Sequence, residues 1–164
     1  MQRGFPNIRH MRVFLETARS GSVSLAAARC HLSQPAATQA IKQLETTIGT
    51  PLLVRSHKQA VPTTCGALFE QRAANAIRHL KEGASAARRE TGLKASASFE
   101  MSVTAAQLRN LIAIANAGSF TVSAKALDLS QPTVHRTARN LEAIAGTPFF
   151  IARRSGVRLT PAAQ

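Results

Sequence analysis

The chain of 164 residues has no tryptophan or tyrosine, only two cysteines and only eight acidic residues. Cys30 and Cys65 show no CxxC or Cys/His spacing, which excludes a disulfide framework and a zinc site. No apolar run approaches the roughly 18 residues of a membrane span, and the N-terminus lacks a signal-peptide core. We therefore expect a soluble protein of the reducing cytoplasm with no membrane partner.

Basic residues are in large excess, because 21 Lys and Arg stand against the eight acids and give a net charge of +13. The excess is shared, with a net charge of +6 over residues 1–66 and +5 over residues 102–164. Such a balance indicates a polyanionic partner. The sequence has no paired nucleophile and base, no glycine-rich phosphate loop and only scattered histidines. We therefore predict no enzyme activity, no cofactor and no metal.

The most informative feature is an internal repeat with a constant offset of 97 residues. The stretches at 21–22, 32–35, 44–45 and 49–51 (GS, LSQP, LE and GTP) return in order at 118–119, 129–132, 141–142 and 146–148. A fixed internal period identifies a repeated structural unit. Each copy is about 60 residues, long enough to fold alone. The chain is therefore predicted to hold two homologous small domains.

Helix signals dominate each copy. The apolar spacing predicts three helices per copy, with helix-capping residues before them and glycines after the first and the third. The predicted caps are Asn7, Ser22 and Ser33 in the first copy and Thr104 (with Gln107 as a capping box), Ser119 and Ser130 in the second. Short extended runs after Pro51 and Pro148 predict a hairpin, or wing, in each copy.

The segment between the copies is predicted to be one long helix from 64 to 91, with an alanine-rich apolar stripe that requires a partner. Residues 92–103, which are rich in serine, are predicted to form a flexible linker. The domains are thus expected at 1–63 and 104–164. The second copy stops where its own long helix would start, so we expect a piece of a longer protein.

Two helices joined by a tight turn, the second capped by Ser-Gln-Pro, form a helix-turn-helix, whose free N–H groups attract phosphate. The first copy carries F-x-x-x-A, G-S, A-A, L-S-Q-P-A, I-x-x-L-E and G-x-P-L-L-x-R, and the second repeats G-S, L-x-x-S-Q-P, L-E and G-x-P in the same order. On these residues each copy resembles the winged helix-turn-helix of LysR-type transcriptional regulators. The implied fold class is mainly α: two tandem winged helix-turn-helix domains joined by a long linker helix.

The resemblance implies sequence-specific binding of double-stranded DNA in transcription regulation in bacteria, at the nucleoid. The implied DNA-binding residues are Ser33, Gln34, Pro35, Thr38, Gln39, Lys42, Arg55, Ser130, Gln131, Pro132, His135, Arg136, Arg139, Arg153 and Arg154. The linker helix of the family dimerises, which implies a homodimer through Leu68, Phe69, Ala73, Ala76, Ile77, Leu80 and Ala84. A small-molecule effector is implied only if an effector domain follows.

The two copies differ at the middle of the recognition helix, where Gln39 stands in the first copy and Arg136 in the second. Glutamine pairs with adenine and arginine with guanine, so different half-sites are expected. One alternative is that only one copy binds DNA while the other contacts protein. Another is a nonspecific architectural or RNA-binding protein, which fits the charge but has few aromatic residues for base stacking.

Overall fold

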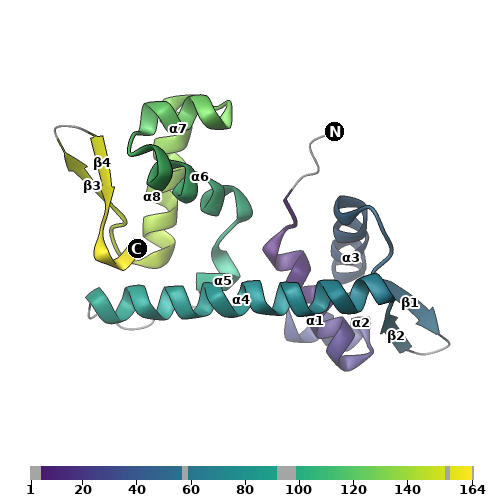
Figure 1. Cartoon of the computed structure of the whole chain (residues 1–164). Helices are drawn as coiled ribbons and strands as arrows, with labels where there is room; N and C mark the ends of the chain where they lie inside the picture. Colours follow the sequence, from purple (N-terminus) through teal and green to yellow (C-terminus); the bar gives the residue numbers. More distant parts are fainter. Residues whose placement is uncertain (1–4, 57–58, 92–98, 154–155, 164) are drawn as a thin grey trace. The chain divides into compact units, whose positions relative to one another are not determined.

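A computed structural model describes residues 5–56, 59–91, 99–153 and 156–163. The chain divides into two compact units, Met1–Arg78 and His79–Gln164. Unit 1 contains α1 (Ile8–Ser20), α2 (Val23–Arg29), α3 (Gln34–Ile48), β1 (Leu53–Ser56) and β2 (Gln59–Pro62) (Figure 1). Unit 2 contains α5 (Phe99–Ser102), α6 (Ala105–Ala117), α7 (Phe120–Leu127), α8 (Gln131–Ala145), β3 (Phe150–Arg153), β4 (Gly156–Leu159) and the 3-10 turn η1 (Pro161–Ala163).

The helix α4 (Thr64–Thr91) begins in unit 1 and ends in unit 2. The predicted fold class is confirmed: the fold is mainly α, with two winged helix-turn-helix domains and the long helix between them. The element boundaries keep the 97-residue offset of the sequence repeat, since α1 and α6, α3 and α8, and the two hairpins begin and end at matching positions. The end of α7 departs from this offset by one residue.

Local chemistry sets the helix ends where the sequence predicts them. The side chain of Asn7 accepts a hydrogen bond from the backbone N–H of Arg9, at 2.9 Å, and begins α1. The capping box of Thr104 and Gln107 begins α6. Gly49 ends α3 in the left-handed region (φ 84°), a conformation that glycine adopts without strain.

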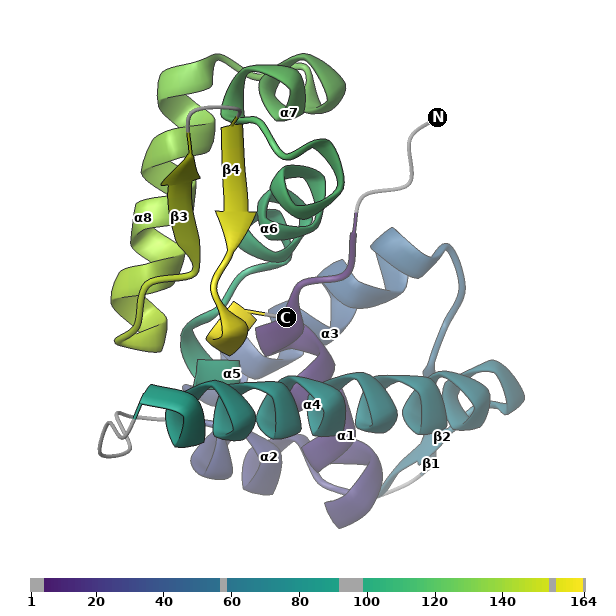
Figure 2. The same ribbon diagram turned by 60° about the vertical axis from the view of Figure 1, so that its left-hand side comes forward.

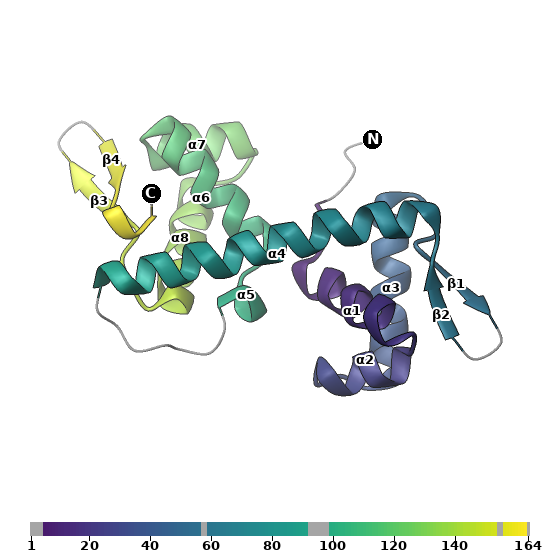
Figure 3. The same ribbon diagram turned by 60° about the horizontal axis from the view of Figure 1, so that its bottom comes forward.

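Unit 1 packs its three helices and its hairpin around a small apolar core. Phe14, Leu44 and Leu52 form a buried cluster. Phe69 from the start of α4 covers this cluster, with its ring 5.4 Å from that of Phe14 in an edge-on arrangement. Figure 3 shows how the β1–β2 hairpin follows α3 and leads into α4. The first turns of α4 are therefore part of the core of unit 1.

Unit 2 repeats this packing with different side chains. Ile114 of α6, Ala124 of α7, and Val134 and Ala138 of α8 form its buried cluster. The β3–β4 hairpin lies beside α8 (Figure 2). The recognition helices α3 and α8 are thus each held by two other helices and flanked by a two-stranded antiparallel wing.

The segment predicted to be a flexible linker, 92–103, differs in part from that expectation. Residues 92–98 lie outside the described residues. Residues 99–102 form the short helix α5, whose Phe99 is buried, and Val103 behind it is buried as well. The serine content of the segment led to the linker prediction. The helical turn instead brings two apolar side chains, Phe99 and Val103, into buried positions.

Candidate nucleic-acid interface

Each recognition helix begins with a cap that leaves its first turn open to solvent. The hydroxyl of Ser33 accepts a hydrogen bond from the N–H of Ala36 at 3.3 Å, and Ser130 caps α8 in the same way. Gln34 and Gln131 follow these caps, and their side chains are exposed. The N-terminus of a helix carries partial positive charge and free N–H groups, so each helix start can accept a phosphate.

The predicted DNA-facing residues of unit 1 share one side of α3. Ser33, Gln34, Pro35, Gln39 and Lys42 are exposed and Thr38 is half-buried. Positions four residues apart lie on the same helix face. The exposed strip is therefore polar, with one positive charge that would meet the phosphate backbone or a base edge.

The corresponding strip of unit 2 is more basic, and two of its side chains are held by neighbours. The ring of His135 packs on Phe120, with centroids 4.8 Å apart. The guanidinium of Arg139 lies 3.0 Å from the carboxylate of Glu142. Arg136, between them in sequence, is exposed, as are Ser130, Gln131 and Pro132 at the helix start. The sequence pattern did not indicate the contact between His135 and Phe120, because it joins two helices.

The wings are fixed to the recognition helices by carboxylates at the ends of those helices. Oε1 of Glu45 accepts hydrogen bonds from the backbone N–H groups of Leu52 and Leu53, at 2.8 and 3.1 Å. Oε1 of Glu142 accepts from Phe149 and Phe150 at the same two distances. Each of these glutamates therefore ties the last turns of a recognition helix to the start of its wing.

Two further contacts recur in both wings. The N–H of Ala60 donates to the carbonyl oxygen of Gly21 at 2.8 Å, and Val157 donates to Gly118 at 2.7 Å. The hydroxyl of Thr63 donates to the carbonyl oxygen of Pro51, as does its repeat equivalent in unit 2. In both units the same bonds thus tie the wing to the turn between the first two helices and join the two ends of the wing.

Of the predicted wing arginines, the structure places one side chain. Arg153 is exposed at the end of β3, where it pairs with Gly156 across the hairpin. The backbone of Arg55 belongs to β1, but its side chain lies outside the described residues, and so does the whole of Arg154. Arg158 of β4 is also exposed.

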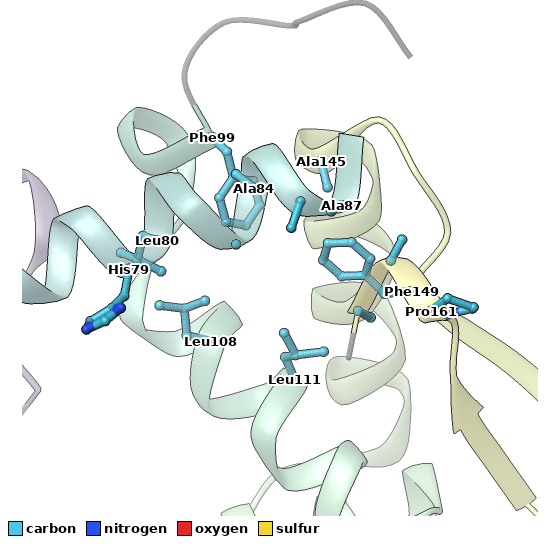
Figure 4. Close-up of a pocket in the computed structure, with 14 residues that line it drawn as sticks. His79, Leu80, Ala84, Ala87, Phe99, Leu108, Leu111, Ala145, Phe149 and Pro161 are labelled. Carbon is cyan, nitrogen blue, oxygen red and sulfur yellow. The ribbon is translucent and has the colours of Figure 1, made fainter. Parts of the chain in front are cut away.

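Three of the seven residues predicted for dimerisation are covered by the chain itself. Phe69 packs on Phe14, and Ala73 and Ile77 are buried. Leu80 and Ala84 line a pocket of about 380 Å³ within unit 2, together with side chains of α5, α6 and α8 (Figure 4). The remaining two predicted residues are exposed: Leu68, at 59%, and Ala76.

The described residues hold no group of three or more side chains suited to a metal ion. Within the same residues, no helix is both long and apolar enough to cross a bilayer.

Known proteins match both units. A family model described as "Bacterial regulatory helix-turn-helix protein, lysR family" matches residues 8–67 and again 105–164, which is more than half of the chain. The chain belongs to the LysR family. The resemblance stated from the sequence is thereby confirmed, and the second copy matches the family model in its own right.

Individual LysR relatives match a stretch of the chain about as long as one copy of the repeat. The chain is 38% identical over 64 residues to the Hca operon transcriptional activator HcaR of Escherichia coli (strain K12), covering 39% of this chain and 22% of the relative. It is 45% identical over 60 residues to the RuBisCO operon transcriptional regulator of Allochromatium vinosum, covering 37% and 20%. The chain thus spans about a fifth of the length of the curated relatives it matches.

Solved LysR structures show the same fold. The complex of Vibrio fischeri DarR with DNA aligns with a TM-score of 0.50 at 28% identity, over 54% of this chain and 30% of that one. The complex of BenM DBD with catB site 1 DNA aligns with a TM-score of 0.50 at 26% identity, over 54% of this chain and 98% of that one.

Proposed function

We propose that this LysR-family chain regulates transcription in the bacterial cytoplasm by sequence-specific binding of double-stranded DNA through both of its units. The observation that supports this most is the repetition of the whole interface. Each unit has a capped, exposed recognition-helix start, a polar or basic strip on the helix and a wing fixed by a glutamate. The DNA complexes of DarR and BenM DBD, which share the fold, agree with this proposal.

The two units are proposed to recognise different half-sites. Gln39 at the middle of the α3 strip offers an amide that pairs with adenine, and Arg136 at the equivalent place on α8 offers a guanidinium that pairs with guanine. Two different modules on one chain bind an asymmetric site more tightly than either alone, because the second binding step is intramolecular. The role assigned to the chain is recognition and not catalysis.

A homodimer through α4 belongs to this proposal, with one condition on the residues it uses. Ala73 and Ile77 are already buried, so a partner helix would have to use the exposed Leu68 and Ala76, or displace side chains that now cover the stripe. The effector domain that the family resemblance implies would be a further domain, separate from these two units.

A second candidate function has its own observation. His135 packs on Phe120 and Arg139 is paired with Glu142, so two of the side chains proposed to face DNA on α8 are engaged inside unit 2. This favours the alternative in which unit 1 binds DNA and unit 2 contacts protein.

The experiment uses the intact chain and a duplex selected by it from a randomised pool. Arg136→Ala should cost about 1–3 kcal/mol on the selected duplex and relax preference at one base pair. Lys42→Ala should weaken binding and reduce the slope of affinity against salt by about one unit. Arg89→Ala, at an exposed position near the end of α4, is the matched control. If Arg136→Ala behaves like the control while Lys42→Ala weakens binding, only unit 1 binds DNA.

A further inference from the structure

Unit 1 contains a pocket of about 280 Å³ at the junction of α3 with the wing. It is lined by Val23 of α2, by Thr38, Ile41, Lys42 and Glu45 of α3, and by the facing strands of the hairpin. Ile41 is buried, whereas Lys42 is exposed. The pocket is therefore apolar inside and open to solvent beside the recognition helix.

The same place in unit 2 is filled by aromatic rings. The 97-residue offset pairs Val23 with Phe120 and Thr38 with His135. The ring of Phe120 packs on His135 at 4.8 Å and on Phe150, the equivalent of Leu53, at 5.7 Å. One fold thus occurs twice, once with rings in this position and once with smaller side chains around a pocket.

We propose that the pocket of unit 1 binds a neutral small molecule that carries an aromatic ring. Unit 2 shows that the surrounding backbone accommodates such rings. The volume is sufficient, because an apolar cavity of about 150 Å³ in another protein accepts benzene. A bound ring would make van der Waals contacts that the small side chains of Val23 and Thr38 do not make with one another.

The charges around the pocket select a neutral molecule. Lys42 and Glu45 both line it, so an ion of either sign meets one group of like charge. Oε1 of Glu45 already accepts two backbone hydrogen bonds that hold the wing, and a cation drawing on this carboxylate would weaken them. A neutral ring disturbs neither contact.

A bound ring and DNA compete for unit 1, a consequence that rests on the proposed function. Thr38 and Lys42 line the pocket and belong to the strip proposed to face DNA. A molecule in the pocket lies beside these side chains and blocks their approach to the groove.

The test measures binding of 4-fluorobenzyl alcohol to the intact, DNA-free chain by fluorine NMR. Val23→Phe introduces the residue of unit 2 and should raise the Kd at least about tenfold, since the ring loses its buried area. Val122→Phe, at an exposed position of α7, is the matched control and should leave the Kd unchanged. The anionic 4-fluorobenzoate and the cationic 4-fluorobenzylamine should both bind more weakly. Equal binding to Val23→Phe and to the unmutated chain would overturn the proposal.

The reverse substitution makes a second test. Phe120→Val should open the equivalent pocket in unit 2, so this variant should bind one equivalent of the probe more than the unmutated chain. An unchanged stoichiometry in a folded variant, checked by circular dichroism, would contradict the proposal. Adding the selected duplex should release the probe from unit 1, and a probe that stays bound would refute the competition. The probe titrations use the DNA-free chain, so they test the pocket even if the chain binds no DNA. A failure of the proposed DNA binding can therefore be told apart from a failure of the proposed ligand binding.

Discussion

Replacing Glu142 by alanine should destabilise unit 2 by about 3 kcal/mol, because two backbone N–H groups lose their partner. Hydrogen bonds to a charged acceptor contribute about 1.5–3 kcal/mol each. The carboxylate accepts from Phe149 and Phe150, and Phe149 is buried, so water cannot replace the lost acceptor fully. We take the lower end of the sum, because removing a buried carboxylate also removes its desolvation cost.

The ion pair with Arg139 contributes much less than the wing bonds. The Arg139 side chain is 67% exposed, and exposed pairs contribute at most about 1 kcal/mol. Glu142→Gln retains an oxygen that accepts both N–H groups, so it should cost about 1 kcal/mol through loss of charge assistance. Arg139→Ala should cost no more than this. A larger cost for Glu142→Ala than for either Glu142→Gln or Arg139→Ala separates the two contributions.

Calorimetry is the suitable assay, since the chain has no tryptophan or tyrosine for fluorescence. Hydrogen exchange locates the effect, because the amides of Phe149 and Phe150 should exchange faster in Glu142→Ala and not in Arg139→Ala. An Arg139→Ala variant as destabilised as Glu142→Ala would refute the reasoning, since the ion pair would then be the main contribution.

Three further outcomes are expected. Asn110→Val, which introduces the residue found at this position of the first copy, should raise the free energy of unfolding by about 1 kcal/mol, because Oδ1 of Asn110 is buried without a hydrogen-bond partner. A variant less stable than the unmutated chain would show that the hydrogen bond from Nδ2 of Asn110 to the carbonyl oxygen of Val134 contributes more. Iodoacetamide should label the exposed Cys65 before Cys30, because burial raises the pKa of the Cys30 thiol. Mass spectrometry follows the labelling of each cysteine, and labelling of Cys30 first would contradict this expectation. Leu68→Glu should abolish a dimer formed through α4, because Leu68 is one of the stripe residues that remain exposed; sedimentation that shows the unmutated chain to be a monomer at tens of micromolar would exclude that dimer.

The elements that the sequence predicted are those whose signals are local. Asn7, Ser33 and Gly49 sit at helix ends because each satisfies or terminates the backbone within a few residues, and the structure has them there. The long helix and both wings followed from the same kind of signal. The repeat strengthened each assignment, since a chance pattern would not return at the same offset.

The contacts that the sequence did not predict join elements distant along the chain. The packing of His135 on Phe120 and the burial of Phe99 depend on how helices meet, which no spacing rule states. The apolar stripe of α4 predicted that this face of the helix packs against another surface. For Phe69 that surface lies within the same chain, on Phe14. Amphipathic patterning identifies a buried face without identifying what covers it.

The central claim is that both units bind DNA, and the intact chain on its selected duplex tests it most directly. Lys42→Glu alters only α3 and Arg136→Glu only α8, and affinity is measured for each across a range of salt concentrations. Two DNA-binding units predict that each variant loses affinity and that each flattens the salt dependence. A loss confined to Lys42→Glu, with Arg136→Glu indistinguishable from the unmutated chain at every salt concentration, would contradict the claim and leave unit 2 as a protein-contact module.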